Sequence, residues 1–169
     1  MTQVGCAMRE GLHLRRYRPE DLEAIFRVDE VCFAEAFRFD RRSMRRFAEA
    51  HRAISVVATG MGAEIVGFVI VHVERTVVGR HGYVVTLDVL PEARRIGVAR
   101  RLMDEAERLA SESGAGWMEL DVFTGNAGAI RFYEQRGYVR VGVRRGFYSK
   151  VGHGPALDAF VYRRELGFS

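Results

Sequence analysis

A chain of 169 residues, 48% apolar and 28% charged, is long enough to form a globular domain and lacks the composition of disordered sequence. Its longest apolar stretch, residues 65–71, is far shorter than the roughly 20 residues that a membrane-spanning helix needs. The net charge of +4 comes from basic residues distributed along the whole chain, mostly with acids nearby, which does not favour a nucleic-acid-binding protein.

The first quarter of the chain predicts one strand followed by two helices. A short strand is expected at residues 12–17. A helix is expected at residues 19–29, because proline suits a first helical turn and the apolar residues that follow recur at helical spacing. A polar and aromatic loop, residues 32–40, comes next. Asp40 is placed to cap a second helix that runs to about Ala50.

The middle of the chain predicts three strands and a long helix. Two strands are expected at residues 53–58 and 64–73, with a glycine-rich turn between them. A third strand, residues 82–89, ends before Pro91, which cannot donate to a sheet ladder. From Val98 onward apolar residues recur at helical spacing until Gly114 ends the pattern.

The last third predicts a strand, a short helix and two further strands. Residues 117–122 alternate between apolar and polar side chains, which is typical of a half-buried strand. Asn126 is expected to open a short helix that Gly137 closes. Strands follow at residues 138–143 and 156–164. The order β α α β β β α β α β β predicts an α/β fold with a mixed central sheet.

No repeat or linker divides the chain, so residues 12–169 are predicted to form a single domain behind an N-terminal extension, residues 1–11. The first residues do not resemble a secretory signal, which makes the cytoplasm the expected location. Two cysteines, Cys6 and Cys32, cannot form a disulfide framework. Because no His or Cys cluster has the spacing of a zinc site, no metal is expected.

An anion-binding site is predicted where residues 89–100 pass from a strand through a loop into a helix. Unpaired backbone N–H groups at such a helix start attract anions. Gly97 has no Cβ and Ala99 has a small side chain, so a pyrophosphate can approach the backbone closely. Arginines at 94, 95 and 100 add positive charge. A tight turn with solvated arginines is the alternative, but the flanking strand and helix, and a second strand–helix unit downstream, favour a phosphate cradle.

Residues 89–100 resemble motif A of the GNAT superfamily of acetyltransferases, whose pattern is Q/R-x-x-G-x-G/A after a strand that ends near a proline. Residues 121–138 resemble motif B of that superfamily, with the more specific core N-x-x-A-I-x-x-Y-E-x-x-G-Y. The similarity covers roughly residues 12–166 and is closest to RimI-type enzymes, which acetylate the N-terminal α-amine of a ribosomal protein. It implies a mixed, mostly antiparallel sheet of about seven strands flanked by about four helices, with the fourth and fifth strands splayed.

The resemblance implies that acetyl-CoA is the co-substrate and that the acceptor amine attacks the thioester directly, without a covalent enzyme intermediate. The pantetheine arm would pair with backbone groups of Leu87, Asp88 and Val89, and the Val89 N–H would polarise the thioester carbonyl. Asn126 would bond the pantetheine as well as cap its helix. The pyrophosphate would lie on the loop and helix start formed by Arg94, Arg95, Ile96, Gly97, Val98, Ala99 and Arg100.

The acceptor must lose a proton before it attacks, and a carboxylate in reach is the usual base. Asp121 is the first candidate, at a position where RimI-type enzymes carry a glutamate. Its shorter side chain implies relay through a water or a shifted substrate. Asp88 and Glu119 are the alternatives, and for each of the three the competing interpretation is a salt bridge to an arginine. Tyr133 stands at the position of the general acid that protonates the departing thiolate; otherwise it is a packed helix aromatic.

The acceptor is expected to be a protein N-terminus or a small amine. In the RimI-type subgroup the loop near Cys32 and Phe33 and the later segment 144–148 frame a peptide groove, and Asp158 stands where that subgroup carries an acid. Aromatic residues at 37, 39, 147 and 148 line a groove or belong to the core. An acetyltransferase for small amines, a non-catalytic acyl-CoA sensor and a nucleic-acid-binding module are the competing hypotheses, and no membrane partner is expected.

Overall fold

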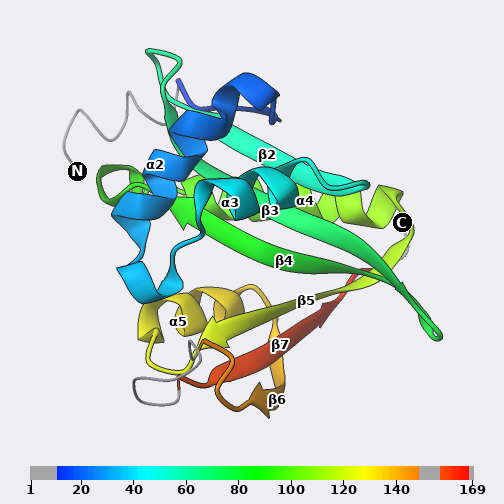
Figure 1. Ribbon diagram of the computed structural model, residues 1–169. Helices are drawn as coiled ribbons and strands as arrows, with labels where there is room; N and C mark the ends of the chain where they lie inside the picture. Colours follow the sequence, from blue (N-terminus) through cyan, green and yellow to red (C-terminus); the bar gives the residue numbers. More distant parts are fainter. Residues whose placement is uncertain (1–10, 149–156, 168–169) are drawn as a thin grey trace.

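The computed structural model describes residues 11–148 and 157–167, which form one seven-stranded sheet with helices on both faces (Figure 1). The strands are β1 (His13–Arg16), β2 (Ala53–Thr59), β3 (Ile65–Thr76), β4 (Gly79–Val89), β5 (Ala115–Phe123), β6 (Val139–Arg144) and β7 (Ala159–Glu165). The helices are α2 (Leu22–Cys32), α3 (Arg41–Ala48), α4 (Val98–Glu112) and α5 (Ala127–Gln135). Short 3₁₀ turns occur at η1 (Pro19–Asp21), η2 (Glu35–Phe37) and η3 (Pro91–Ala93). This confirms the predicted order of elements.

The sheet has the strand order β1-β2-β3-β4-β5-β7-β6, and every neighbouring pair is antiparallel except β4 and β5. Parallel neighbours need a long crossover, which α4 provides. The mixed, mostly antiparallel sheet that was expected is therefore confirmed.

The parallel pair β4–β5 separates partway along its length, which confirms the predicted splay. Its pairing runs from Arg80 opposite Ala115 to Val84 opposite Leu120 and then stops. On the other side of β4, Ile70 of β3 faces Thr86 whereas Val71 faces Val84, so Val85 is an extra residue on β4. Such a bulge bends its strand. The bend coincides with the point at which β4 leaves β5.

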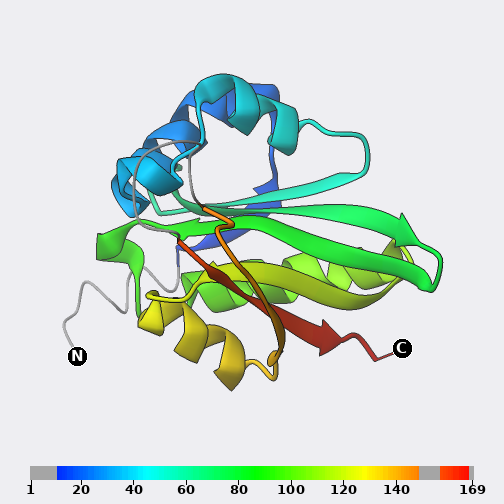
Figure 2. The same ribbon diagram turned by 60° about the horizontal axis from the view of Figure 1, so that its bottom comes forward.

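Helices cover both faces of the sheet. Figure 2 shows α2 and α3 (blue and cyan) on one face and α4 and α5 (green to yellow) on the other. The core beneath α2 and α3 includes Ile25, Met44 and Phe68. The core beneath α4 includes Leu102 and Met118. The two cores share the central strands. Both faces of β4 are therefore buried near the end that has separated from β5.

The predicted caps and stops are present. The Asp40 side chain accepts a hydrogen bond from the Ser43 backbone N–H at 2.8 Å. The Asn126 side-chain oxygen accepts one from the Ala129 backbone N–H at 3.1 Å. Gly114 and Gly137 follow α4 and α5 with positive φ angles, which glycine adopts without strain.

Several boundaries differ from the prediction. The first helix opens as η1 and extends to Cys32, three residues beyond residue 29, and the predicted loop 32–40 contains η2. Strands β3 and β4 reach the ends of their hairpin, where Thr76 pairs with Gly79, because antiparallel pairing continues past the apolar residues. Residues 1–10 of the predicted extension 1–11 lie outside the described residues, and so does residue 156, the predicted start of the last strand.

We expect Gly67→Ala to destabilise the protein, because Gly67 lies where β3 supports the free end of β4. A Cβ there would lie 2.8 Å from the Asp88 carbonyl oxygen and 3.3 Å from Val98 Cγ1. Forcing an extra methyl into such a packed position costs about 1–3 kcal/mol. Urea unfolding measures the loss. Gly116→Ala in β5 is the matched control, since its Cβ would meet its nearest neighbour at 3.9 Å; an equal loss in both variants would contradict this account.

Candidate active site

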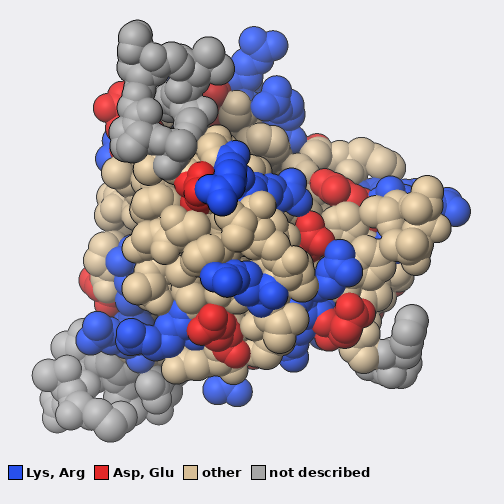
Figure 3. Space-filling model, turned by 90° about the horizontal axis from the view of Figure 1, so that it is seen from below, with Lys and Arg blue, Asp and Glu red and all other residues tan. Residues whose placement is uncertain are grey.

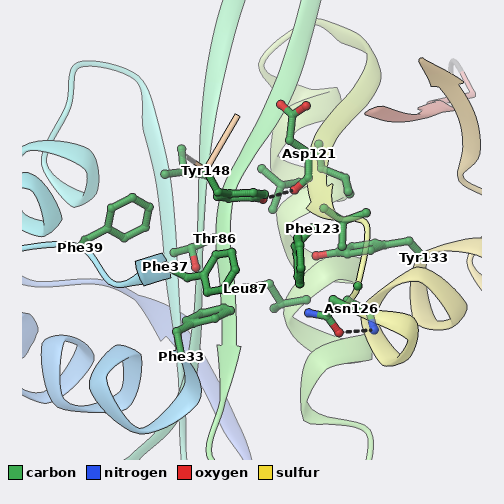
Figure 4. A pocket seen from close by; sticks show the side chains of 16 residues that line it. Phe33, Phe37, Phe39, Thr86, Leu87, Asp121, Phe123, Asn126, Tyr133 and Tyr148 are labelled. Atoms are coloured by element: carbon green, nitrogen blue, oxygen red, sulfur yellow. Dashed lines mark hydrogen bonds between the residues drawn. The ribbon is translucent and has the colours of Figure 1, made fainter. Parts of the chain in front are cut away.

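The splay between β4 and β5 opens a cavity of about 370 Å³, called here the central cavity (Figure 4). Its two strand walls are residues 84–87 of β4 and 120–123 of β5. Figure 4 shows Tyr133 and Asn126 on one side of it and Phe33 and Phe37 on the other. Because β4 and β5 are the parallel pair, the cavity lies beyond the carboxyl ends of their paired segments, where α/β folds commonly bind ligands.

Two further cavities adjoin the central one. The helix-side cavity borders α4 and α5. Besides residues shared with the central cavity, it is lined by Cys32, Asp88, Val89, Arg94, Ala99, Gly128 and Phe132. The aromatic cavity borders α3 and is lined by Phe47, His72, Tyr83 and Phe147, again with shared residues. The shared residues are Phe33, Leu87, Asn126, Ala129 and Tyr133 for the helix-side cavity, and Phe37, Phe39, Val85, Asp121 and Tyr148 for the aromatic cavity.

The free edge of β4 presents backbone groups to the central cavity. The Leu90 N–H bonds to the Val66 carbonyl of β3 at 2.9 Å. Successive residues of a strand point their N–H groups to opposite sides, so those of Leu87 and Val89 point toward the departed β5. The Val89 carbonyl oxygen accepts from Arg94 Nε at 2.9 Å and from Cys32 Sγ at 3.3 Å. The strand end therefore offers donors to a ligand beside it.

The loop before α4 leaves the start of that helix open. Arg95 and Gly97 both have positive φ angles, and nothing lies within 4 Å of the position of a Gly97 Cβ. The first intrahelical bond runs from the Arg101 N–H to the Gly97 carbonyl. The N–H groups of residues 98–100 consequently have no acceptor within the helix. They lie at the positive end of the helix dipole, which suits an anion.

The predicted cradle side chains divide into two groups. The Ile96 and Val98 side chains pack against the core beneath α4. Arg95 and Arg100 are exposed to solvent, where they can approach an anion, and Arg100 lies 4.0 Å from Asp104. Arg94 is also exposed but bonds the Val89 carbonyl. The backbone of the loop, rather than a ring of arginines, is the main donor surface.

Asp121 lies on β5 with a side chain that is 1% exposed. Its Oδ2 accepts a hydrogen bond from the Tyr83 hydroxyl at 2.8 Å, and Arg144 Nε lies 3.0 Å from Oδ1. Burial raises the pKa of this carboxyl above its ordinary value, while Tyr83 and Arg144 act in the opposite direction. A raised pKa makes the carboxylate a stronger base.

The two alternative carboxylates have different surroundings. Glu119 lies on the same face of β5 and pairs with Arg144 at 3.3 Å and Arg163 at 3.1 Å. Asp88 is buried on β4 and accepts a hydrogen bond from Thr86. Burial raises the pKa of Asp88 well above its ordinary value. Of the three carboxylates, only Asp121 lines the central cavity.

Tyr133 projects from α5 and points its hydroxyl into the central cavity, as Figure 4 shows. Burial raises the pKa of this phenol, so it stays protonated and able to donate at neutral pH. Asn126 lies at the start of the same helix. Its oxygen is occupied by the Ala129 N–H, which leaves its amide N–H groups for the cavity.

Three residues of the site were not predicted in their observed roles. Tyr83 was not considered, although its place opposite Glu119 in the parallel register puts it on the face of Asp121. Arg144 was expected only within a groove segment, yet it contacts Asp121. Tyr148 was expected to line a groove or belong to the core, but not to donate to the Asp121 carbonyl, as it does at 3.3 Å. Such contacts depend on strand register, which a single sequence does not specify.

Asp158 anchors the segment that carries Arg144 and Tyr148. Its Oδ1 accepts a hydrogen bond from the Gly146 N–H at 2.8 Å, and its backbone carbonyl accepts from the Thr124 N–H at 3.1 Å. The acid expected before the last strand therefore holds one wall of the aromatic cavity in place.

Among the described residues, no group of three or more His, Cys, Asp or Glu side chains is arranged to hold a metal ion. No helix in residues 11–148 or 157–167 is long and apolar enough to cross a membrane. Figure 3 shows Lys and Arg side chains interspersed with Asp and Glu on the face that it displays.

Known proteins resemble this chain in sequence. Over 102 residues the chain is 34% identical to the N-terminal acetyltransferase B complex catalytic subunit naa20 of Schizosaccharomyces pombe, covering 60% of this chain and 56% of that protein. The corresponding Arabidopsis thaliana subunit NAA20 is 34% identical over 84 residues, 49% of this chain and 48% of that protein. The chain thus spans about half the length of the curated relatives it matches.

Solved structures share the fold over almost the whole chain. The Escherichia coli ribosomal-protein-S18-alanine N-acetyltransferase superposes with a TM-score of 0.79 at 20% identity, covering 94% of this chain and 96% of that one. Arabidopsis thaliana NAA60 in complex with a bisubstrate analogue gives 0.78 at 21% identity, covering 94% and 99%. The sequence also matches the model of the Acetyltransferase (GNAT) family over residues 20–138, more than half of the chain. This protein belongs to the GNAT family of acetyltransferases.

Proposed function

We propose that this protein transfers an acetyl group from acetyl-CoA to the N-terminal α-amine of a protein or peptide, as RimI-type enzymes do, in the cytoplasm. The observation that carries the proposal is the central cavity between β4 and β5, where a buried carboxylate and a buried phenol meet an open strand edge. The 34% identity to an N-terminal acetyltransferase subunit supports an α-amine acceptor.

The described residues fit acetyl-CoA. An open approach at Gly97 and the unbonded amides at the start of α4 suit its pyrophosphate. The N–H groups of Leu87 and Val89 and the amide of Asn126 suit the pantetheine arm. Acetyl-CoA supplies the activated acetyl thioester. The helix-side cavity, which borders α4 and α5, connects the region proposed for the pyrophosphate with the region proposed for the pantetheine arm.

The side chains around the central cavity divide the proton transfers between them. Asp121 takes a proton from the acceptor ammonium, directly or through a water, because an ammonium cannot attack a thioester. Tyr133 holds the proton that the departing thiolate needs. In this proposal the Val89 N–H stabilises the negative charge that develops on the carbonyl oxygen. The nitrogen still carries one extra proton after it bonds the acetyl carbon, and the Tyr133 phenolate left by the departing thiol takes it, which restores the phenol; the proton on Asp121 passes to solvent.

The aromatic cavity suits a peptide. It adjoins the central cavity at Asp121 and is lined by Phe37, Phe39, Phe147 and Tyr148. Aromatic side chains bind apolar chain segments with little loss of side-chain entropy. A peptide that lies here brings its terminal amine to the carboxylate at the boundary between the two cavities.

The test is acetyl transfer from acetyl-CoA to peptides with a free or a blocked α-amine, beside a panel of small amines, followed by mass spectrometry. We expect one acetyl group on the free α-amine and none on the blocked peptide. Turnover of small amines alone would contradict the peptide acceptor. Binding of acetyl-CoA without turnover of any amine would instead indicate an acyl-CoA sensor.

We expect Arg144→Gln to shift the pH dependence of the reaction. Arg144 lowers the pKa of Asp121, so its removal raises that pKa further. Since the base must be ionised, kcat/KM falls as pH drops through this pKa, and the acid limb moves to higher pH in the variant. Arg163→Gln is the matched control, because Arg163 pairs with Glu119. Identical pH profiles of kcat/KM for wild type and Arg144→Gln would contradict the coupling.

A further inference from the structure

Two carboxyl groups that the proposed reaction does not use are buried together between α2 and β4. Asp29 is 0% exposed and the Asp88 side chain lies in a residue that is 1% exposed. Asp29 Oδ2 accepts the Phe39 backbone N–H at 3.1 Å, and Asp88 Oδ1 accepts the Thr86 hydroxyl. The other two oxygens, Asp29 Oδ1 and Asp88 Oδ2, have no donor within the described part of the chain.

The packing of α2 on the end of β4, where Cys32 Sγ bonds the Val89 carbonyl, brings the two carboxyls near each other, and each shifts the pKa of the other. Two carboxylates can only accept, so if both were ionised they would repel each other and leave two buried oxygens without a donor. A single proton between them removes both penalties, because a neutral acid donates to its charged neighbour. Burial raises the pKa of both groups, and that of Asp88 rises well above its ordinary value.

Within residues 11–148 and 157–167, no cation forms an ion pair with either carboxyl. Arg38 lowers the pKa of Asp29 and Arg94 lowers that of Asp88. Their Nε groups, however, bond the carbonyl oxygens of Phe33 and Val89. Glu30 and Cys32 of α2 and Tyr133 of α5 also interact with the pair. None of the ion pairs in the described residues includes Asp29 or Asp88.

The pair fixes a loop that forms one wall of the site. The aromatic loop, residues 33–39, begins after Cys32, whose Sγ donates to the Val89 carbonyl at 3.3 Å. It ends at Phe39, whose N–H donates to Asp29. Three of its phenylalanines line the central cavity. Both ends of the loop are thus tied, through α2, to the free end of β4.

We propose that Asp29 and Asp88 share one proton and act as positioning residues, holding the aromatic loop against the strand end that binds the thioester. This inference rests on the proposed function for its effect on catalysis. The shared proton itself does not depend on that function. Neither carboxyl group contacts a reacting atom. The pair instead sets the distance between the aromatic loop and β4.

The first experiment measures urea unfolding of wild type and Asp88→Asn between the ordinary Asp pKa and alkaline pH. Asparagine imitates the protonated acid but does not titrate. A carboxyl whose folded pKa is raised binds more protons folded than unfolded, so the stability of the wild type falls as pH rises toward that pKa. Over the pH range in which the folded wild type binds one more proton than the unfolded chain, its equilibrium constant for unfolding should rise about tenfold per pH unit relative to that of Asp88→Asn.

Equal pH slopes for wild type and Asp88→Asn would overturn the shared proton. Asp21→Asn is the matched control, since Asp21 is also buried but pairs with Arg15 at 2.7 Å and has a lowered pKa. Its stability should retain the wild-type slope over this pH range. If Asp21→Asn lost the pH dependence of stability seen in the wild type, that dependence would belong to another group, which would contradict the proposal.

The second experiment measures acetyl transfer to the peptide substrate by Asp29→Asn and Asp29→Ala. Asparagine keeps an acceptor for the Phe39 N–H and a donor toward Asp88, whereas alanine removes both. Loss of such a buried hydrogen bond should raise the acceptor KM about tenfold in Asp29→Ala, with kcat little changed. Asp29→Asn should restore the KM to within about twofold of wild type.

An unchanged acceptor KM in Asp29→Ala would refute the positioning role, and so would a fall in kcat alone. If the wild type acetylates no peptide, the proposed function fails, whereas the pH slope of Asp88→Asn still decides whether the two carboxyls share a proton. The two failures are therefore distinguishable.

Discussion

Asp121→Asn should reduce kcat/KM for the acceptor by about 10²–10⁴-fold at neutral pH, the range that general acid–base catalysis contributes. The amide keeps the shape of the side chain and can still accept the Tyr83 hydrogen bond, but it cannot take a proton. Binding of acetyl-CoA, measured by calorimetry, should be unchanged, because the predicted cradle lies at the start of α4.

Glu119→Gln is the control for this variant, since Glu119 lies on the same strand face and shares Arg144 with Asp121. We expect it to retain activity. Loss of activity in Glu119→Gln with a fully active Asp121→Asn would move the base to Glu119. Asp121→Glu should remain active, because it restores the residue that RimI-type enzymes are expected to carry here.

Tyr133→Phe should lower kcat by about tenfold or more while leaving the affinity for acetyl-CoA nearly unchanged, because the phenol is needed only as the thiolate departs. The ring contacts with Phe132 and Tyr138, at 5.2 and 5.5 Å between centroids, do not require the hydroxyl. The folded structure should therefore persist, and thermal unfolding checks this.

A series of acetyl thioesters whose leaving thiols differ in pKa gives a sharper test of Tyr133. Steady-state rates of wild type and Tyr133→Phe are compared across the series. A thiol of low pKa leaves without help from an acid, so the effect of Tyr133→Phe should shrink as the leaving-group pKa falls. Unchanged turnover with acetyl-CoA itself would remove Tyr133 from the mechanism and leave it as a packed aromatic residue of α5.

Much of the fold could be predicted from the sequence because local signals agree with the final structure. Apolar periodicity specified α4 from Val98 onward, and alternation placed Asp121 and Glu119 on one face of β5. Asp40 and Asn126 cap their helices as expected. Strands β3 and β4 are longer than predicted at their shared hairpin, because regular pairing continues there past the apolar residues.

The contacts that tune the site could not be predicted in the same way. The hydrogen bond between Tyr83 and Asp121 joins residues that are far apart in the chain, and it depends on the parallel register of β4 and β5. Placing Asp29 beside Asp88 requires the packing of α2 on β4. The sequence ranked Asp121 first but left a salt bridge open for each of the three candidate carboxylates, because burial and neighbours, rather than residue type, decide the pKa.

The opening between β4 and β5 also bears on the order in which substrates bind. The helix-side cavity borders α4 and α5, whereas the aromatic cavity borders α3 across the sheet. The cavities proposed for acetyl-CoA and for the peptide therefore give the two substrates separate entry routes. Neither molecule then blocks the route of the other. Initial-rate plots should show intersecting lines, and the spent thiol should be able to depart while the modified peptide is still in place.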